Sequence, residues 1–203
     1  PNDQLVRVSR KGQAWMLEGL PKGEKGSVRW SPDGKTIAYT GDVDESDPWG
    51  VRNTKLYVVD AGGGEPVCLT EKDDYCLSCS TISDTRDSSH SASVEWTPDS
   101  KSLVASIGTR GEMQVGLIDA KKGGLTLLTK GWHVIGAGNL SADGRWLACT
   151  FGDAVSLDEV ALYDLGEKPE WPSRLTDLNR AFHDDVELST PDEVWLDSTD
   201  GTK

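Results

Sequence analysis

The chain has 203 residues, of which 36% are hydrophobic, and this length allows one all-β domain or two small domains. Its formal net charge of −13 makes nucleic acid and anionic membrane surfaces poor partners. No apolar stretch is long enough to cross a bilayer, and we find no signal peptide. Because the first residue is Pro1 rather than an initiator Met, we expect a segment of a longer protein.

The first predicted element, within residues 1–20, is a pair of strands. The apolar runs Leu5–Ser9 and Trp15–Leu17 flank the turn sequence Lys11-Gly12-Gln13. Short apolar runs on both sides of a Gly-containing turn are typical of a β-hairpin.

Residues 27–70 form the first complete unit of a pattern that recurs later. Trp30-Ser-Pro-Asp-Gly34 is followed by the apolar runs Ile37–Thr40 and Leu56–Asp60, and then by a last strand carrying Leu69-Thr70. In the turn, Pro sets φ, Asp tolerates the second central position and Gly accepts a positive φ. Apolar runs around such a turn indicate antiparallel strands joined as hairpins.

Residues 93–129 and 137–176 repeat this pattern column by column. Their turns are Trp96-Thr-Pro-Asp-Ser100 and Leu140-Ser-Ala-Asp-Gly144. Ser100 replaces the turn glycine, and a left-handed conformation there would cost roughly 1 kcal/mol. Repeating units of about 40 residues are typical of β-propeller blades.

The repeat predicts an all-β fold, a partial β-propeller of four-stranded antiparallel blades. Runs that are apolar on both faces suit strands sandwiched between neighbouring sheets. Residues 27–70, 93–129 and 137–176 would each form a blade, and residues 1–20 match the second half of an earlier one. Since three and a half blades leave apolar sheet faces open, we expect association with a missing chain or a second copy, as in a homo-oligomer.

Two long polar insertions, residues 41–54 and 71–92, interrupt the first complete unit and its link to the next. One insertion joins the second and third strands of a blade, and the other joins its fourth strand to the first strand of the next blade. In an antiparallel blade these two connections leave the sheet on the same face, opposite the tight turns. Long loops on a rigid scaffold concentrate function, so Trp49, Arg52 and Asn53 are candidate binding residues for a partner surface or substrate. The alternative is that Trp49 packs against the blade rim and Arg52 pairs with neighbouring acids.

The four cysteines are Cys68, Cys76, Cys79 and Cys149. Cys68 and Cys149 lie on predicted buried strands, which fits free thiols in a reducing compartment, and hence a cytoplasmic protein, better than a disulfide scaffold. Cys76 and Cys79 have a spacing used by metal and redox sites, but zinc needs two more ligands, and His90 is the one nearby candidate. Ordinary loop thiols are the alternative that we favour, with no metal site.

Catalytic constellations are absent from the sequence. It contains no Gly-x-Ser-x-Gly elbow, no His-Gly-Gly oxyanion motif and no phosphate-binding glycine loop. His90, His133 and His183 are scattered, and none has a context that suggests a base. We therefore expect this segment alone to catalyse nothing and to bind no cofactor.

Residues 177–203 follow the last unit and differ from it. Leu178–Asp185 could form a short helix-like linker, Glu193–Asp197 is a predicted strand, and Ser198–Gly201 is a predicted hairpin turn. A strand that starts a hairpin without its partner suggests the beginning of a further domain.

This tail resembles the junction in the prolyl oligopeptidase family, most closely its acylaminoacyl-peptidase branch. There the last blade runs through Leu-Thr-x-Leu-Asn, as at Leu175–Asn179, into a strand and an Asp-Gly-Thr turn that opens an α/β-hydrolase domain. The Ser-Pro-Asp-Gly blades and the insertion at Asp47–Asn53 look similar too. The resemblance covers essentially the whole chain; its blade motifs are shared with TolB-like propellers, and residues 174–203 are the more specific part.

The resemblance implies the propeller segment of a serine peptidase that acts on short peptides. The propeller would cap the hydrolase domain, its main partner, and limit substrate access by size. The Ser-Asp-His triad would lie beyond Lys203, so no catalytic residue is assigned in this chain. The alternative is a non-enzymatic, TolB-like propeller that binds partner proteins through its loop face. A third, metal-dependent reading rests on Cys76, Cys79 and His90.

Overall fold

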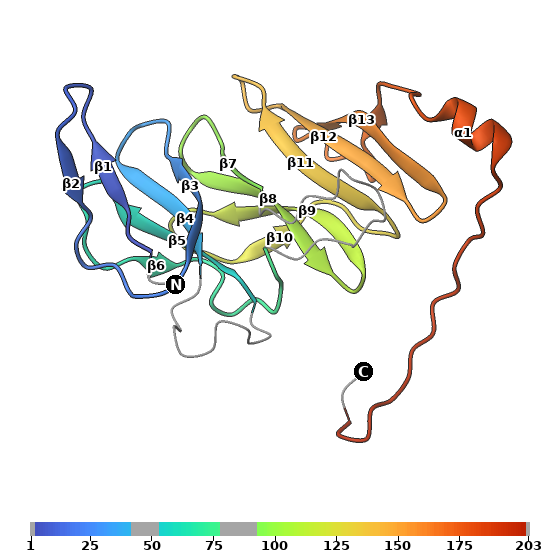
Figure 1. Ribbon diagram of the computed structural model, residues 1–203, viewed down its shortest axis with the longest axis horizontal. Coiled ribbons are helices and arrows are strands. Elements are labelled where there is room, and N and C mark those ends of the chain that lie inside the picture. The colour runs from blue at the N-terminus through green and yellow to red at the C-terminus, as the bar shows by residue number, and fades with distance from the viewer. Residues whose placement is uncertain (1–2, 42–52, 78–92, 202–203) are drawn as a thin grey trace.

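The computed structural model describes residues 3–41, 53–77 and 93–201 (Figure 1). Within these ranges the chain is nearly all β, with one short helix, α1 (Arg180–Asp185), and no helix that could cross a membrane. The strands are β1 (Val6–Val8), β2 (Ala14–Met16), β3 (Lys25–Trp30), β4 (Thr36–Gly41), β5 (Lys55–Asp60), β6 (Val67–Cys68), β7 (Val94–Trp96), β8 (Ser102–Thr109), β9 (Glu112–Asp119), β10 (Leu125–Leu127), β11 (Val134–Leu140), β12 (Trp146–Asp153), β13 (Ser156–Asp164) and β14 (Ser173–Arg174).

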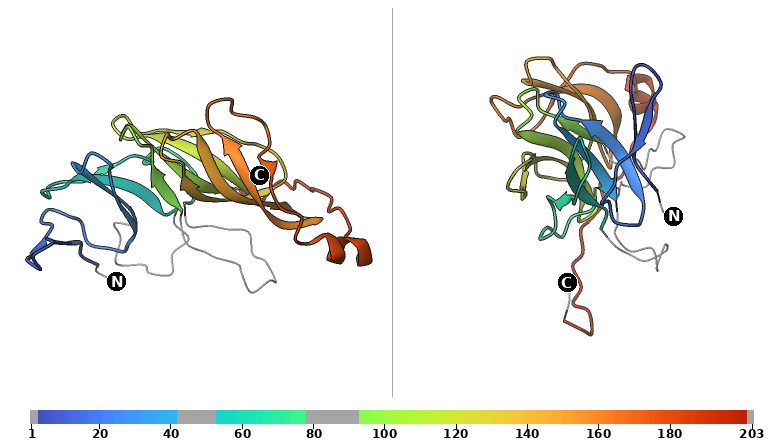
Figure 2. Two further views of the ribbon diagram at one scale, coloured as in Figure 1. Left: turned by 90° about the horizontal axis from the view of Figure 1, so that it is seen from above. Right: turned by 90° about the vertical axis from the view of Figure 1, so that its left-hand side faces the viewer.

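The strands form the antiparallel blades that the sequence repeat predicts. One sheet has the order β3-β4-β5-β6, and β7 to β10 and β11 to β14 pair in the same sequential order. The latter two blades are also linked by a single parallel pair, Val134 with Met113. Strands β1 and β2 form a two-stranded sheet at the N-terminal end. Figures 1 and 2 show these sheets following one another from the N-terminal to the C-terminal end of the molecule. The predicted fold class is confirmed.

Alternate residues of the inner strands face the two neighbouring sheets. Ile37 and Tyr39 of β4 pack toward the N-terminal hairpin, whereas Ala38 packs in a cluster shared with β7 and β8. Likewise Val104 of β8 packs toward β11, β12 and β13, and Leu103 packs toward β4 and β5. This stacking explains why the runs are apolar on both faces.

The turn between the first two strands of each blade is held by one recurring pair of side chains. Ser31 Oγ donates to Asp33 Oδ1 at 2.7 Å and accepts the Thr36 N–H at 3.0 Å, while Asp33 Oδ1 also accepts the Lys35 N–H at 3.1 Å. The other blades make the same bonds with Thr97 and Asp99 and with Ser141 and Asp143. These bonds hold the pKa of each Asp below its ordinary value.

The last residue of each turn has a positive φ, as the turn chemistry predicts. Gly34 and Gly144 both have a φ of +71°, and Ser100 has a φ of +59°. Ser100 therefore adopts the left-handed conformation that the sequence anticipated. Its hydroxyl also accepts the Asp33 N–H at 3.1 Å, so this departure from glycine links the turns of two neighbouring blades.

The recurring Leu-Thr pairs lie just beyond the outer strands, not within them as expected. Strands β6, β10 and β14 end at the residue directly before the leucine of each pair. The backbone N–H of each leucine still donates to a carbonyl of the third strand at 2.7–2.8 Å, and the threonine hydroxyl accepts the N–H of that same third-strand residue at 2.9–3.0 Å. These bonds join Thr70 to Leu56, Thr129 to Val115 and Thr176 to Val160.

The tail differs from its prediction in one element. A short helix, α1, and a turn closed by the Gly201 N–H on the Ser198 carbonyl at 3.0 Å are both present. The predicted strand Glu193–Asp197 is wrong, because the segment has no regular structure. A strand needs a neighbouring edge for its backbone groups, and the described residues offer this segment none.

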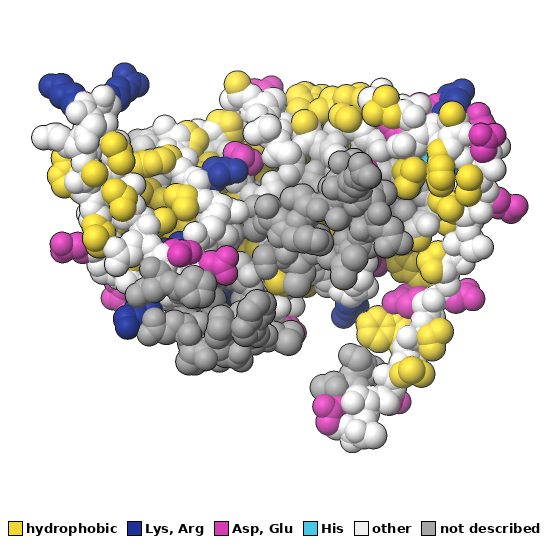
Figure 3. All heavy atoms as spheres, in the orientation of Figure 1, with side chains coloured by type: hydrophobic (Ala, Val, Ile, Leu, Met, Phe, Trp, Pro, Cys, Tyr) yellow, Lys and Arg dark blue, Asp and Glu magenta, His cyan; other side chains and the backbone are white. Residues whose placement is uncertain are grey.

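Both ends of the stack expose apolar groups that interior blades bury. Leu69 is 3% exposed, whereas its counterpart Leu175 in the last blade is 58% exposed. At the N-terminal end Trp30 is 48% exposed, while the corresponding Trp96 is 7% exposed. An apolar groove of about 310 Å³ lies there, between residues 4–8 and strand β3, and Figure 3 shows hydrophobic side chains over this end.

Candidate functional site

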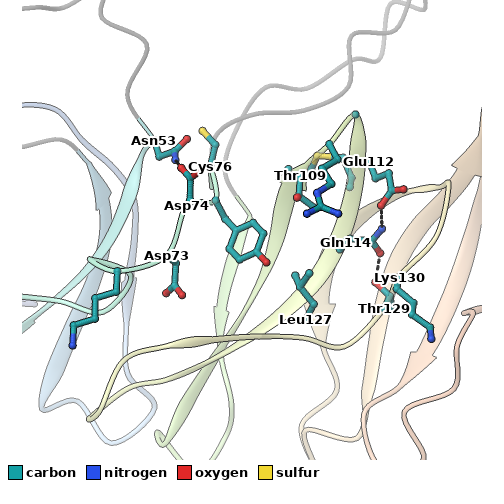
Figure 4. Close-up of a pocket in the computed structure, with 16 residues that line it drawn as sticks. Asn53, Asp73, Asp74, Cys76, Thr109, Glu112, Gln114, Leu127, Thr129 and Lys130 are labelled. Carbon is teal, nitrogen blue, oxygen red and sulfur yellow. Dashed lines mark hydrogen bonds between the residues drawn. The ribbon is translucent and has the colours of Figure 1, made fainter. Parts of the chain in front are cut away.

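A groove lies between the first two complete blades. Its volume is about 910 Å³, and residues 53, 72–76, 108–114, 127 and 129–130 line it (Figure 4). All of these residues lie at the ends of strands or in the connections β4–β5, β6–β7, β8–β9 and β10–β11. In antiparallel blades these connections leave the sheets on one face, which we call the loop face.

One wall of the groove is the segment 72–77, which is bonded to both blades. The Leu77 N–H donates to the Thr54 carbonyl at 3.4 Å, and the Gly108 N–H donates to the Cys76 carbonyl at 3.1 Å. The Lys55 ammonium donates to the Asp73 carbonyl at 2.5 Å. The segment therefore bridges the blades and fixes the width of the groove.

The opposite wall rests on a buried polar network around Gln114, which is 1% exposed. Its amide nitrogen donates to Glu112 Oε2 at 2.8 Å and to the Gly131 carbonyl at 2.9 Å. Its amide oxygen accepts the Thr129 hydroxyl at 2.8 Å, and that hydroxyl accepts the Val115 N–H at 2.9 Å. Because every polar group of the Gln114 and Thr129 side chains is bonded, this wall is well ordered.

The groove carries charges of both signs. Lys72, Arg110 and Lys130 supply cations, and Asp73, Asp74 and Glu112 supply carboxylates. Such a lining suits polar groups of either charge, as a peptide or protein surface presents. Among the described residues, the lining contains Thr, Tyr and Cys side chains but no histidine to serve as their base. The groove therefore has the chemistry of a binding site.

His133, next to this region, is also unsuited to catalysis. It is 2% exposed, and its ring lies 5.6 Å from that of Phe151 and 5.0 Å from that of Trp171 between ring centroids. Burial lowers its pKa, which the nearby Asp153 partly opposes. No described residue bonds to either ring nitrogen, so no nucleophile is paired with it.

Of the three predicted binding residues, the structure describes Asn53. Its side-chain N–H donates to Asp74 Oδ1 at 2.8 Å, and it lines the groove. Trp49 and Arg52 lie outside the described residues. The residues of the opposite wall were not identified from the sequence. Gln114 was the available signal, because it is a polar residue within the otherwise apolar strand β9.

The cysteine pattern is only partly covered by the structure. Cys149 is a buried free thiol and Cys68 is a half-buried one, while Cys76 is buried beside the groove. Cys79 and His90 lie outside the described residues, so the metal reading stays untested. Within the described ranges no group of three or more His, Cys, Asp or Glu side chains could hold a metal ion.

Solved structures share this architecture at low sequence identity. TolB from Acinetobacter baumannii matches with a TM-score of 0.58 and 22% identity, over 85% of this chain and 40% of its own. A prolyl endopeptidase matches with a TM-score of 0.58 and 19% identity, over 86% of this chain and 26% of its own. The β-propeller domain of the Trilobed protease from Pyrococcus furiosus matches with a TM-score of 0.54 and 18% identity, over 87% of this chain and 44% of its own.

This chain folds as part of a β-propeller. It spans less than half the length of each of those three structures. No family model matches the chain, and no curated protein matches it. The likeness to solved structures therefore shows the fold, and the function has to be argued from the site and the tail.

Proposed function

We propose that this chain is the propeller segment of a serine peptidase of the prolyl oligopeptidase family, similar to acylaminoacyl peptidases, that acts on short peptides. One observation carries the proposal. The chain leaves the last blade on the loop face, through the Leu175–Asn179 motif and α1, toward the turn at Ser198–Gly201. The exit and the groove thus share a face, so a hydrolase domain attached to the tail would lie over the groove.

In this role the segment gates and docks substrate. The rigid blades limit what enters by size, and the mixed charges of the groove hold polar groups of a peptide near the entrance. Chemistry belongs to the attached hydrolase domain, its principal partner. Free thiols at Cys68 and Cys149 support a reducing compartment, and we place the parent protein in the cytoplasm.

The test uses the complete coding sequence. We expect a Gly-x-Ser-x-Gly motif within about two hundred residues after Lys203, at the nucleophile elbow of an α/β-hydrolase domain. The full-length product should release the blocked first residue from short N-acylated peptides but not from folded proteins. Replacing the motif serine by alanine should abolish this activity. Absence of the motif, or equal cleavage of peptides and folded proteins, would refute the proposal.

The second candidate is a non-enzymatic, TolB-like propeller that binds partner proteins through its loop face. The match to TolB supports the same architecture, and the open, charged groove suits a protein surface as well as a peptide. The two candidates differ in the sequence that follows the tail. A parent protein without a hydrolase domain would favour the second.

We also propose that the chain associates through its exposed ends, with its own hydrolase domain or with a second copy. The apolar groove beside β3 and the exposed Leu175 leave sheet faces that need cover. Sedimentation equilibrium of the 203-residue chain over a range of concentrations should show species heavier than the 22.0 kDa monomer. A single monomeric species throughout would contradict association with a second copy.

A further inference from the structure

The carboxylate of Glu159 is buried at the end of the last blade, and the exit segment supplies four of its hydrogen bonds. Glu159 is 5% exposed. Its Oε1 accepts the Asn179 N–H at 2.8 Å and the Asn179 side-chain N–H at 3.0 Å. Its Oε2 accepts the Leu178 N–H at 2.9 Å and the hydroxyl of Thr176. The donors lie 17 to 20 residues away in sequence, at the start of the tail.

These bonds stabilise the ionised form of the side chain. The Thr176 hydroxyl and the two backbone N–H groups lower the pKa of Glu159 to about 2 despite its burial. Hydrogen bonds to a charged acceptor are roughly twice as strong as neutral ones. The exit segment is therefore held more firmly than an ordinary connection.

In the other two complete blades, the residue equivalent to Glu159 in the repeat also bonds to the connection that follows its blade. Lys55 donates to the Asp73 carbonyl in the β6–β7 connection, and Gln114 donates to the Gly131 carbonyl in the β10–β11 connection. In those blades the held segment leads into the next blade. Glu159 holds the segment that leads out of the last described blade into the tail.

Two further contacts hold the tail against the body. The Leu157 N–H, in the same strand as Glu159, donates to His183 Nε2 of α1 at 3.3 Å. Farther along, the Arg110 guanidinium lies 5.7 Å from the ring centroid of Trp195, at the rim of the groove. The tail thus leaves the last blade at a fixed point, and Trp195 contacts Arg110 on the same loop face.

We propose that Glu159, Thr176 and Asn179 form a latch that sets the direction in which the chain leaves the propeller. Glu159 is a positioning residue in this latch. The proposal rests on the proposed function in one respect, that a hydrolase domain follows the tail and is oriented by it. If the hydrogen bonds of the latch were lost, the blades would stay folded and the tail would move away from the groove.

The test is hydrogen–deuterium exchange of the 203-residue chain, followed by mass spectrometry of peptides that cover residues 176–186. Glu159→Gln removes the charge at constant shape, and Asn179→Ala removes the tail side chain that donates to Glu159 Oε1 and to the Asp158 carbonyl, each at 3.0 Å. Each should speed exchange in residues 176–186 at least tenfold, with exchange in β12 unchanged. Asp184→Asn, an exposed change in α1, is the matched control and should alter exchange less than twofold.

A second measurement follows the tail directly. With 5-fluorotryptophan incorporated, the resonance of Trp195 is assigned from its loss in Trp195→Phe. This resonance should shift in both latch variants, because Trp195 loses its contact with the Arg110 guanidinium, and it should stay in place in the control. Unchanged exchange and an unmoved resonance in both variants would overturn the latch, and so would faster exchange spread equally over β12 and β13. Neither measurement needs peptidase activity, so the latch and the proposed function can fail separately.

Discussion

Gly34→Ala tests whether the recurring turn depends on a left-handed residue. Gly34 has a φ of +71°, and a Cβ added there would meet no heavy atom within 4 Å. The substitution therefore changes backbone strain alone. An alanine at this φ costs about 1–2 kcal/mol. For a chain of this size each kcal/mol lowers the melting temperature by about 2–4 °C.

Two other turns make the prediction quantitative. Gly144 has the same φ, but its added Cβ would lie 2.7 Å from Pro98 Cδ in the neighbouring blade. Overpacking of this kind adds about 1–3 kcal/mol, so Gly144→Ala should cost about 2–5 kcal/mol in total. Ser100→Gly should stay within about 1 kcal/mol of the parent chain, because relief of strain is offset by the lost bond to the Asp33 N–H.

The assay is urea unfolding followed by tryptophan fluorescence, with the slope of the unfolding free energy against urea compared among variants. Gly111→Ala is the matched control, since Gly111 has a φ of +81° and the same open space around its Cβ position. It should cost as much as Gly34→Ala. An unchanged midpoint for Gly34→Ala, or equal costs for Gly34→Ala and Gly144→Ala, would refute the reasoning.

Three further predictions concern buried groups. Thr129→Val should lower the unfolding free energy by about 2–3 kcal/mol in the same assay, because the buried Val115 N–H loses its acceptor and Gln114 loses a donor. Tyr39→Phe should be neutral or stabilising by up to about 1 kcal/mol, since the buried hydroxyl has no partner among the described residues. Burial raises the pKa of Cys149 to about 11, so mass spectrometry should find it unmodified by iodoacetamide at pH 8 in the folded chain and modified in urea.

The turns and the inner strands could be predicted from the sequence because their columns repeat the same residues. The residues Ser31, Asp33 and Gly34 recur as Thr97, Asp99 and Ser100 and as Ser141, Asp143 and Gly144, so the local chemistry is visible three times. The groove could be predicted only in part. The insertions pointed to its face and to Asn53, but which blade ends meet across it depends on how the sheets stack.

The predicted strand at Glu193–Asp197 was wrong for a related reason. Val194 and Trp195 have strong β propensity, but propensity reflects a pleated, half-buried environment that a neighbouring strand provides. In the described structure Val194 is 74% exposed and Leu196 is 77% exposed. Local sequence therefore identifies a segment able to form a strand, and only the tertiary environment decides whether it does.

The latch shows why a repeat can hide its functional positions. Lys55, Gln114 and Glu159 occupy one column but are cationic, neutral and anionic, so alignment of the units makes the column look variable. The structure shows that each side chain matches what its connection offers. Lys55 donates to a carbonyl, Gln114 donates to one and accepts a hydroxyl, and Glu159 accepts four donors. The positions that are the same in all units thus form the blade itself. The residue at this variable position differs from blade to blade because it bonds to a different following segment.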